Sequence, residues 1–362
     1  MTPADLSRTV VRAVRHAVER RELPREAAVG RVLERVVVQP TRPGGVGDYA
    51  TPVAFGLAKV LGGSPGPRDV AEVLARRLGR EPGIRSVAVT GGGFLNFFLA
   101  PDAGLVDAVR GAGPRYGYGD ALAGRRVPVP EGPEPRARMY GEAVAALVRA
   151  QGGEPEAGGP APAPLRRGDR DAAERFGGGA VRWAVLDTPS GETPDFHPVL
   201  LRQHEDNPFF RVRYAHARAR ALLRNAADLG FGPAGIAPPA ATAPPAAPAP
   251  AAAGGVGTAA GTAPPAAAGT AAPTPLDPAL TRALAEYPLV LEAAAHHRAP
   301  DRLTRHLATL ADALLDAQHD VLPRGDEKPS VAHRSRLALA EAAGTVLAGG
   351  LSLLGLDAPE FL

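Results

Sequence analysis

The stretch from Asn207 to Arg218 reads Asn-Pro-Phe-Phe-Arg-Val-Arg-Tyr-Ala-His-Ala-Arg, and it decides the fold of the second half of the chain. The pattern predicts a helix over residues 208–226, apolar on two sides with arginines between them. One apolar stripe comprises Phe210, Tyr214, Ala217 and Ala221, and the other comprises Val212, Ala219 and Leu223. A helix of this kind packs inside a bundle, so we expect an all-α domain.

The sequence beyond this helix extends the all-α domain. Further helices are expected at about 277–286, 288–297, 300–319 and 331–354. Residues 233–275 are almost entirely Ala, Pro, Gly and Thr, which predicts a flexible, disordered linker because these side chains cannot build a core. We therefore expect a helical-bundle domain formed by residues 172–232 and 276–362 and interrupted by the linker.

The first part of the chain predicts an α+β domain over residues 1–103. Helices are expected at 5–22, 50–61 and 68–79, and a strand that begins with Val36 to Val38 and ends at Pro40. Two further strands, 84–89 and 94–99, are joined by the triple glycine 91–93 in a hairpin turn. Residues 104–171 carry a weaker pattern, with one helix from Met139 to Ala150 and a Pro/Ala/Gly stretch at 153–164 that is not expected to order on its own.

Composition and charge limit the classes of function. The 362 residues include no cysteine, which excludes disulfides and thiolate metal sites, and no apolar run is long enough for a membrane span. Acidic residues in the first 30 positions are unlike a secretory signal, so we expect a cytoplasmic protein. Residues 1–103 carry a net charge of +5 and residues 276–362 one of −4, so the N-terminal part is better suited to phosphate contacts.

Several short motifs carry no chemistry. The triple glycine 91–93 lies between strands, whereas a phosphate loop precedes a helix, and the triple glycine 177–179 is typical of a helix stop. His204 and the pair His296-His297 have no partners at metal-ligand spacing. The sequence thus predicts no metal, no cofactor and no catalytic residue.

Three groups of residues resemble the two ends of the arginyl-tRNA synthetase family, a class I family. Gly47-Asp48-Tyr49-Ala50-Thr51 and the hairpin 91–97 resemble its N-terminal tRNA-contacting domain, and 207–218 resembles the entry helix of its DALR-type anticodon-binding domain. Downstream matches continue to the last residues. The resemblance covers roughly 1–101 and 172–362, apart from the linker.

The resemblance implies a catalytic core that this chain lacks. The family carries a His-x-Gly-His motif and a lysine-bearing loop that stabilise charge on the ATP phosphates. Residues 104–195 contain no histidine and no lysine, and the stretch 130–138 stands where the histidine motif belongs. We interpret 104–171 as a vestigial remnant of a Rossmann-type core, and we expect no aminoacylation.

The resemblance also implies RNA contacts. Phe94 and Asn96 match the positions that meet the tRNA D-loop, where an aromatic ring stacks on a base and an amide hydrogen-bonds to its edge. The alternative is that Phe94 is a core residue and Asn96 a turn residue. Tyr214, Arg218 and the terminal Leu362 match anticodon-contacting positions. The alternative is that Tyr214 is a core residue, since a helical wheel places it on one of the two apolar stripes.

Two departures weaken the resemblance at the anticodon site. The family usually ends in Arg-Met, whereas this chain ends in Phe361-Leu362, and residues 314–320 are acidic where aromatic residues are expected. The leading hypothesis is a non-catalytic tRNA-binding protein, with a tRNA for arginine as the first candidate and no membrane contact. The alternatives are a regulatory module that binds a protein partner through the old RNA surface, and an active arginine–tRNA ligase that binds ATP.

Overall fold

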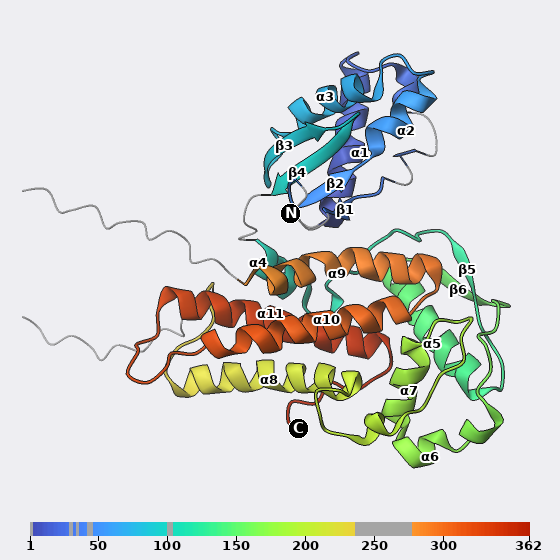
Figure 1. Ribbon diagram of the computed structural model, residues 1–362, viewed down its shortest axis with the longest axis vertical. Helices are drawn as coiled ribbons and strands as arrows, with labels where there is room; N and C mark the ends of the chain where they lie inside the picture. Colours follow the sequence, from blue (N-terminus) through green and yellow to red (C-terminus); the bar gives the residue numbers. More distant parts are fainter. Residues whose placement is uncertain (1–2, 29–31, 34–35, 42–45, 100–103, 236–276) are drawn as a thin grey trace, which may run out of the picture.

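The computed structural model describes all residues except 1–2, 29–31, 34–35, 42–45, 100–103 and 236–276. Nearly all of the predicted linker 233–275 therefore lies outside the described residues. A small α+β body at the N-terminus faces a longer helical body, and helix α1 of the first lies beside helix α9 of the second (Figure 1).

The N-terminal body is a four-stranded antiparallel sheet of order β1-β2-β4-β3 with three helices packed on it. Its elements are α1 (Pro3–Glu19), β1 (Gln39–Pro40), β2 (Tyr49–Thr51), α2 (Val53–Val60), α3 (Pro67–Leu78), β3 (Ile84–Thr90) and β4 (Phe94–Leu99). The apolar face of α1 supplies Leu6, Val10 and Val14 to the core, as the four-residue spacing predicts.

Two expectations for this body were wrong. The strand expected from Val36 ends at Pro40 as predicted but begins only at Gln39, and residues 50–51 belong to β2 rather than to a helix. The motif that begins at Gly47 explains the second error. Thr51 is fully buried and donates a hydrogen bond of 2.7 Å to the carbonyl of Val37, so the segment is held extended by tertiary contacts that propensity does not include.

The middle of the chain forms a parallel strand–helix–strand unit. Strand β5 (Arg126–Val129) leads through α5 (Pro135–Ala150) to β6 (Glu154–Ala157), and the two strands pair in parallel. The expectation that 153–164 would not order was wrong at its start, because backbone pairing with β5 extends 154–157. Short helices α4 (Leu105–Ala112), α6 (Ala172–Phe176) and α7 (Gly178–Asp187) flank this unit.

Four long helices complete the helical body: α8 (Pro208–Asp228), α9 (Pro278–His297), α10 (Asp301–Ala317) and α11 (Val331–Leu353). A single hydrophobic core joins them to α4, α5 and α7, so the middle segment and the bundle form one packed unit. Helices α8 and α11 approach each other closely, since a Cβ on Gly344 would lie only 2.9 Å from that of Ala219.

Helix α9 runs without interruption through Pro288, where the sequence predicted two helices. Proline lacks an N–H, which leaves the carbonyl four residues earlier without its helical partner. The buried hydroxyl of Tyr116 donates a hydrogen bond of 3.2 Å to that carbonyl, on Leu284. A tyrosine far away in the sequence thus replaces the missing donor, and the helix continues.

Because His306 of α10 is buried, we expect the folded protein to lose stability in acid. Burial lowers the pKa of His306 from 6.5 to about 4, and its Nε2 lies 2.9 Å from the carbonyl of Ala283. Below pH 6.5 the unfolded chain gains a proton that the folded chain resists, so stability falls as the pH falls towards 4. We expect about 2 kcal/mol of this loss to be absent in His306→Gln, measured by urea unfolding at pH 7 and pH 4.5. Equal pH dependence in the two proteins would contradict it.

Candidate nucleic-acid interface

The β3–β4 hairpin presents one aromatic ring to solvent. Phe94 is 44% exposed, and its ring packs edge-on against Phe55, with 5.0 Å between ring centroids. Phe94 therefore has a ring surface available for the expected contact with RNA, and that contact stays a prediction. The alternative that Phe94 is a core residue was wrong. Phe55, which supports the ring, was not singled out in the sequence because an aromatic residue in a helix usually belongs to the core.

Asn96 lies differently from Phe94. Its side chain is only 6% exposed, and its amide donates a hydrogen bond of 2.7 Å to the hydroxyl of Thr90. A weaker bond of 3.4 Å reaches the carbonyl of Ala88. The amide thus fastens the two strands of the hairpin together. Asn96 lies within β4 and not in the turn that the alternative expected, and contact between Asn96 and RNA stays a prediction.

The Gly47-Asp48 motif positions this hairpin. Gly47 has a φ of +83°, and a Cβ at this position would lie 2.7 Å from the carbonyl oxygen of Phe97. The carboxylate of Asp48 accepts a hydrogen bond of 2.8 Å from the backbone N–H of Leu99. Glycine is therefore required by both backbone conformation and space, and the motif joins β2 to the end of β4.

Helix α8 begins at a strong cap. The side chain of Asn207 accepts hydrogen bonds from the N–H groups of Phe209 and Phe210, at 3.1 and 3.2 Å. The ring of Tyr214 is 40% exposed and stacks on that of Phe210, with centroids 5.7 Å apart. The apolar stripe that included Tyr214 was therefore wrong, and this tyrosine presents a ring surface that a base can stack on.

Arg218 lies one turn after Tyr214 and is held by a partner from the turn that follows α10. Its Nε donates a hydrogen bond of 2.6 Å to the side-chain oxygen of Gln318. Gln318 belongs to the segment 314–320, in which the sequence lacks the expected aromatic residues. The pair fixes the direction of the guanidinium close to the exposed ring of Tyr214.

The C-terminal tail lies along α8 and occupies several of its polar groups. The ring of His216 lies 2.8 Å from the carbonyl of Pro359, and burial lowers the pKa of this histidine. Arg220 forms an ion pair of 2.9 Å with Glu360, and the guanidinium of Arg224 lies 4.2 Å from the centre of the Phe361 ring. Part of the arginine face of α8 is therefore paired within the chain.

Leu362 ends the described chain at a small cavity. Its side chain is 54% exposed and, with Phe209, Phe210 and Arg213, lines a hollow of about 520 Å³. The guanidinium of Arg213 lies 5.2 Å from the centre of the Phe209 ring. Leu362 and Phe210 thus line the same cavity, and the anticodon contact that the resemblance implies for Leu362 stays a prediction.

The start of α5 is where a strand–helix–strand unit would bind a phosphate group. Here the chain fills that position itself. The carboxylate of Glu134 accepts a hydrogen bond of 2.8 Å from the N–H of Ala137. The side chain of Arg136 is fully buried and donates to the carbonyls of Ala163, Thr188, Pro189 and Glu192.

The buried arginine was not recognised from the sequence. Arg136 stands among exposed charged residues in 130–138, and no pattern distinguishes it from Arg138. The loops that supply its acceptors lie about 30 and 50 residues later in the chain, at 163 and 188–192. Only tertiary structure brings them to the start of α5.

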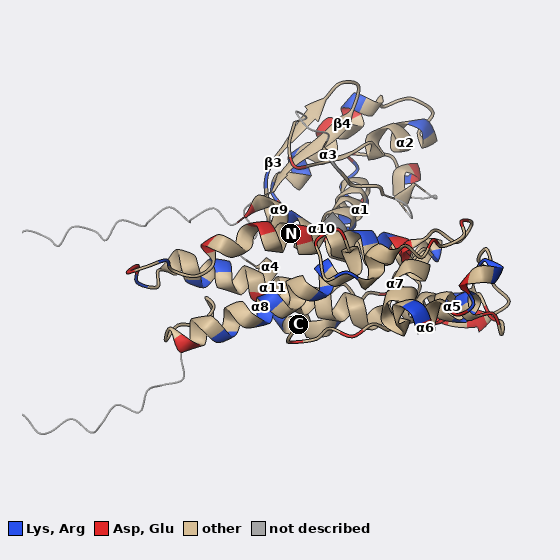
Figure 2. Ribbon diagram, turned by 60° about the horizontal axis from the view of Figure 1, so that its bottom comes forward, with Lys and Arg blue, Asp and Glu red and all other residues tan. Residues whose placement is uncertain are grey.

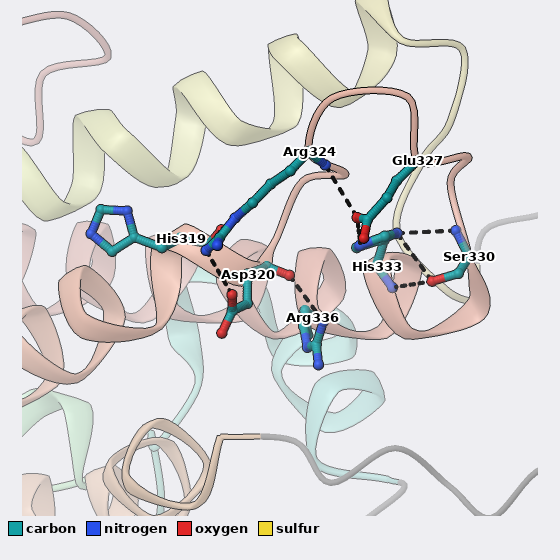
Figure 3. Close-up of polar contacts among 7 residues, drawn as sticks. All are labelled: His319, Asp320, Arg324, Glu327, Ser330, His333 and Arg336. Carbon is teal, nitrogen blue, oxygen red and sulfur yellow. Dashed lines mark hydrogen bonds and ion pairs between the residues drawn. The ribbon is translucent and has the colours of Figure 1, made fainter.

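Some charged groups elsewhere in the helical body are paired with each other, and basic and acidic segments are interspersed along it (Figure 2). The loop between α10 and α11 is one example, in which Arg324 donates to Asp320 at 2.8 Å and its N–H to Glu327 at 3.2 Å (Figure 3). Ser330 and His333 cap the start of α11 reciprocally. This loop organises the turn into α11.

The described residues contain neither a candidate metal site nor a membrane-spanning helix. Within them, no group of three or more His, Cys, Asp or Glu side chains is arranged to hold a metal ion. In the same part of the chain, no helix combines the length and the apolar character that crossing a bilayer requires.

Comparison with protein families identifies the two ends of the chain. Residues 8–99 match the arginyl tRNA synthetase N terminal domain. Residues 266–362 match the DALR anticodon binding domain.

Curated relatives match only in part. The arginine–tRNA ligase of Frankia alni is 37% identical over 194 residues, which is 52% of this chain and 30% of the ligase. That of Clavibacter sepedonicus is 32% identical over 194 residues, again 52% of this chain and 29% of the ligase. The chain thus matches less than a third of the length of each.

A solved structure supports the architecture. Arginyl-tRNA synthetase from Thermus thermophilus superposes with a TM-score of 0.64 at 15% identity, covering 99% of this chain and 100% of that chain. At this identity the similarity is one of fold.

Proposed function

We propose, from the kinship of both ends of this chain with arginyl-tRNA synthetases, that it is a non-catalytic protein that binds tRNA. In this proposal the N-terminal body contacts the D-loop side of the tRNA and α8 contacts the anticodon arm. A tRNA for arginine is the first candidate, and the cytoplasm is the expected location.

The main support for the loss of catalysis is the start of α5. Adenylation needs cationic groups beside the ATP phosphates, and residues 104–195 contain no histidine and no lysine. The position that would receive a phosphate is occupied by the Glu134 cap and by the four carbonyls that surround Arg136. We interpret the unit β5–α5–β6 as what remains of a Rossmann-type core.

The support for RNA binding is the exposure of two aromatic rings at positions that match the family. Phe94 and Tyr214 are 44% and 40% exposed, and each is backed by a second ring that holds it in place. A base can stack on such a ring without sequence preference. Arg218 adds a positive charge close to one of them.

A second candidate function is binding of a protein partner through the same surface. This candidate is favoured because two arginines of α8 already form ion pairs within the chain. Arg211 pairs with Asp312 at 2.6 Å, and Arg220 pairs with Glu360 at 2.9 Å. Paired arginines attract phosphates less strongly than free ones. Purification of a stable protein complex that contains no RNA would favour this candidate.

Binding of total tRNA, measured by fluorescence anisotropy at increasing KCl, tests the proposal. We expect saturable binding that weakens with salt. Tyr214→Ala should weaken binding by about 1–3 kcal/mol through lost stacking, whereas Tyr118→Ala should not, although Tyr118 is similarly exposed at 39%. In the same preparation, ATP–pyrophosphate exchange with arginine should be absent.

The two parts of the proposal fail separately. Absence of saturable binding would reject the RNA-binding role. Arginine-dependent exchange would reject the loss of catalysis and restore the ligase alternative.

A further inference from the structure

A large cavity lies at the junction of the two bodies, and we call it the junction cavity. Its volume is about 1300 Å³, and it is lined from one side by α1 and from the other by α9 and the start of α10. The segment 36–39 and Tyr49 complete its wall on the side of the N-terminal body. The cavity is therefore formed only when the two bodies lie together.

The lining is rich in arginine from both sides. The polar face of α1 contributes Arg8, Arg12 and Arg15, which lie one turn apart. Arg302 and Arg305 come from α10, and Arg125 comes from the loop before β5. Six guanidinium groups thus converge on one space from three parts of the chain.

Half of these arginines are available for a ligand. Arg8 and Arg12 form ion pairs of 3.0 and 2.9 Å with Asp5 and Glu81, and Arg305 pairs with Asp301. Within the part of the chain that the structure describes, the guanidinium groups of Arg15, Arg125 and Arg302 form no hydrogen bond or ion pair, whereas the backbones of Arg125 and Arg302 are hydrogen-bonded. All three are exposed.

The remaining lining consists of apolar and ionisable groups. Leu33, Val36 and Leu289 provide apolar surface. Glu19, Glu286 and Glu292 also face the cavity, and burial raises the pKa of Glu286. The histidines of the lining are His16, His296, His297 and His306. The cationic groups thus outnumber the acidic ones.

We propose that the junction cavity binds the ribose–phosphate backbone of a folded RNA, so that one RNA segment contacts both bodies. This inference rests on the proposed function. Arginine is suited to phosphate because its guanidinium can donate two parallel hydrogen bonds. Cations on opposite walls match a polyanion that passes between them, while the apolar patches match ribose and base surfaces. The occupied arginines hold the walls in place.

The double variant Arg15→Ala/Arg302→Ala tests the junction cavity, with tRNA binding measured at several KCl concentrations. Each phosphate contact contributes about 0.7–0.9 to the slope of log K against log salt. We expect the slope to fall by about 1.5 and the affinity to fall by about tenfold or more. The control is Arg167→Ala/Arg170→Ala, which removes the same charge from exposed positions outside the cavity.

A second measurement tests where tRNA binds on the protein, rather than which charges its binding needs. The chain contains no cysteine, so Ser7→Cys introduces a single thiol into the lining of the cavity. We expect bound tRNA to shield this thiol, so that its rate of reaction with a maleimide falls in proportion to the fraction of the protein that is bound to tRNA. The control Ala161→Cys lies in an exposed segment outside the cavity and should react equally with and without tRNA.

The outcomes separate this inference from the function on which it rests. If the wild-type chain binds no tRNA, the proposed function fails and the inference fails with it. If tRNA binds but the two double variants behave alike, the inference is wrong while the function stands. Poly-glutamate serves as a probe for an acidic protein segment. If Arg15→Ala/Arg302→Ala loses poly-glutamate binding but binds RNA as well as the control variant does, the cavity takes an acidic protein segment and the inference is overturned.

Discussion

Arg136→Met is expected to destabilise the protein by about 3–5 kcal/mol, because several buried carbonyls lose their charged donor at a cost of about 1–3 kcal/mol each. The side chain is fully buried and donates to four backbone carbonyls, including those of Glu192 at 2.5 Å and Pro189 at 2.9 Å. Methionine fills a similar volume but donates nothing. The carbonyls of the loops at 163 and 188–192 would then be buried without a donor.

Urea unfolding followed by circular dichroism measures this effect. The control is Arg138→Met, which removes the same charge from an exposed position two residues later in α5. We expect the control to change the free energy of unfolding by less than about 0.5 kcal/mol. Equal stability of the two variants would show that Arg136 does not hold the loops together.

The second large effect is expected from Gly141→Ala in α5. Alanine is favoured over glycine inside a helix by about 1 kcal/mol. Here, however, a Cβ would lie 2.1 Å from the carbonyl oxygen of Pro130, well inside contact distance, and the obstacle is backbone. The helix would have to move away from β5, and we expect a net loss of about 3 kcal/mol.

Gly111→Ala is the matched control. Gly111 also lies in a helix, α4, and a Cβ at this position would meet no atom within 4 Å. We expect this variant to unfold at a higher urea concentration than the wild type, with a gain of about 0.5–1 kcal/mol. A stabilising effect of Gly141→Ala would mean that α5 does not pack against Pro130 as described.

The sequence predicted most of the helices and the hairpin because their apolar residues repeat with the period of the element. Helices α3, α8 and α11 begin or end within two residues of the predicted bounds. The errors occurred where a distant residue replaces a local signal. Pro288 should have ended a helix, but the hydroxyl of Tyr116 supplies the missing donor.

The candidate site was predictable only in part, again because some of its contacts depend on residues that are distant in the sequence. Resemblance located Phe94 and Tyr214, and both proved exposed. It did not reveal that the amide of Asn96 is used within the hairpin, since this depends on cross-strand distances to Thr90 and Ala88. The junction cavity was not predictable, because Arg15 and Arg302 meet only when the two bodies lie together.

The single core shared by the middle segment and the bundle limits how far this chain can be shortened by evolution. Trp183 of α7 and Tyr140 of α5 are buried in the same core as Leu291 of α9. A deletion that removed α5 would expose the core of the bundle to water. If catalysis has been lost, as proposed, selection for folding alone is enough to preserve β5, α5 and β6.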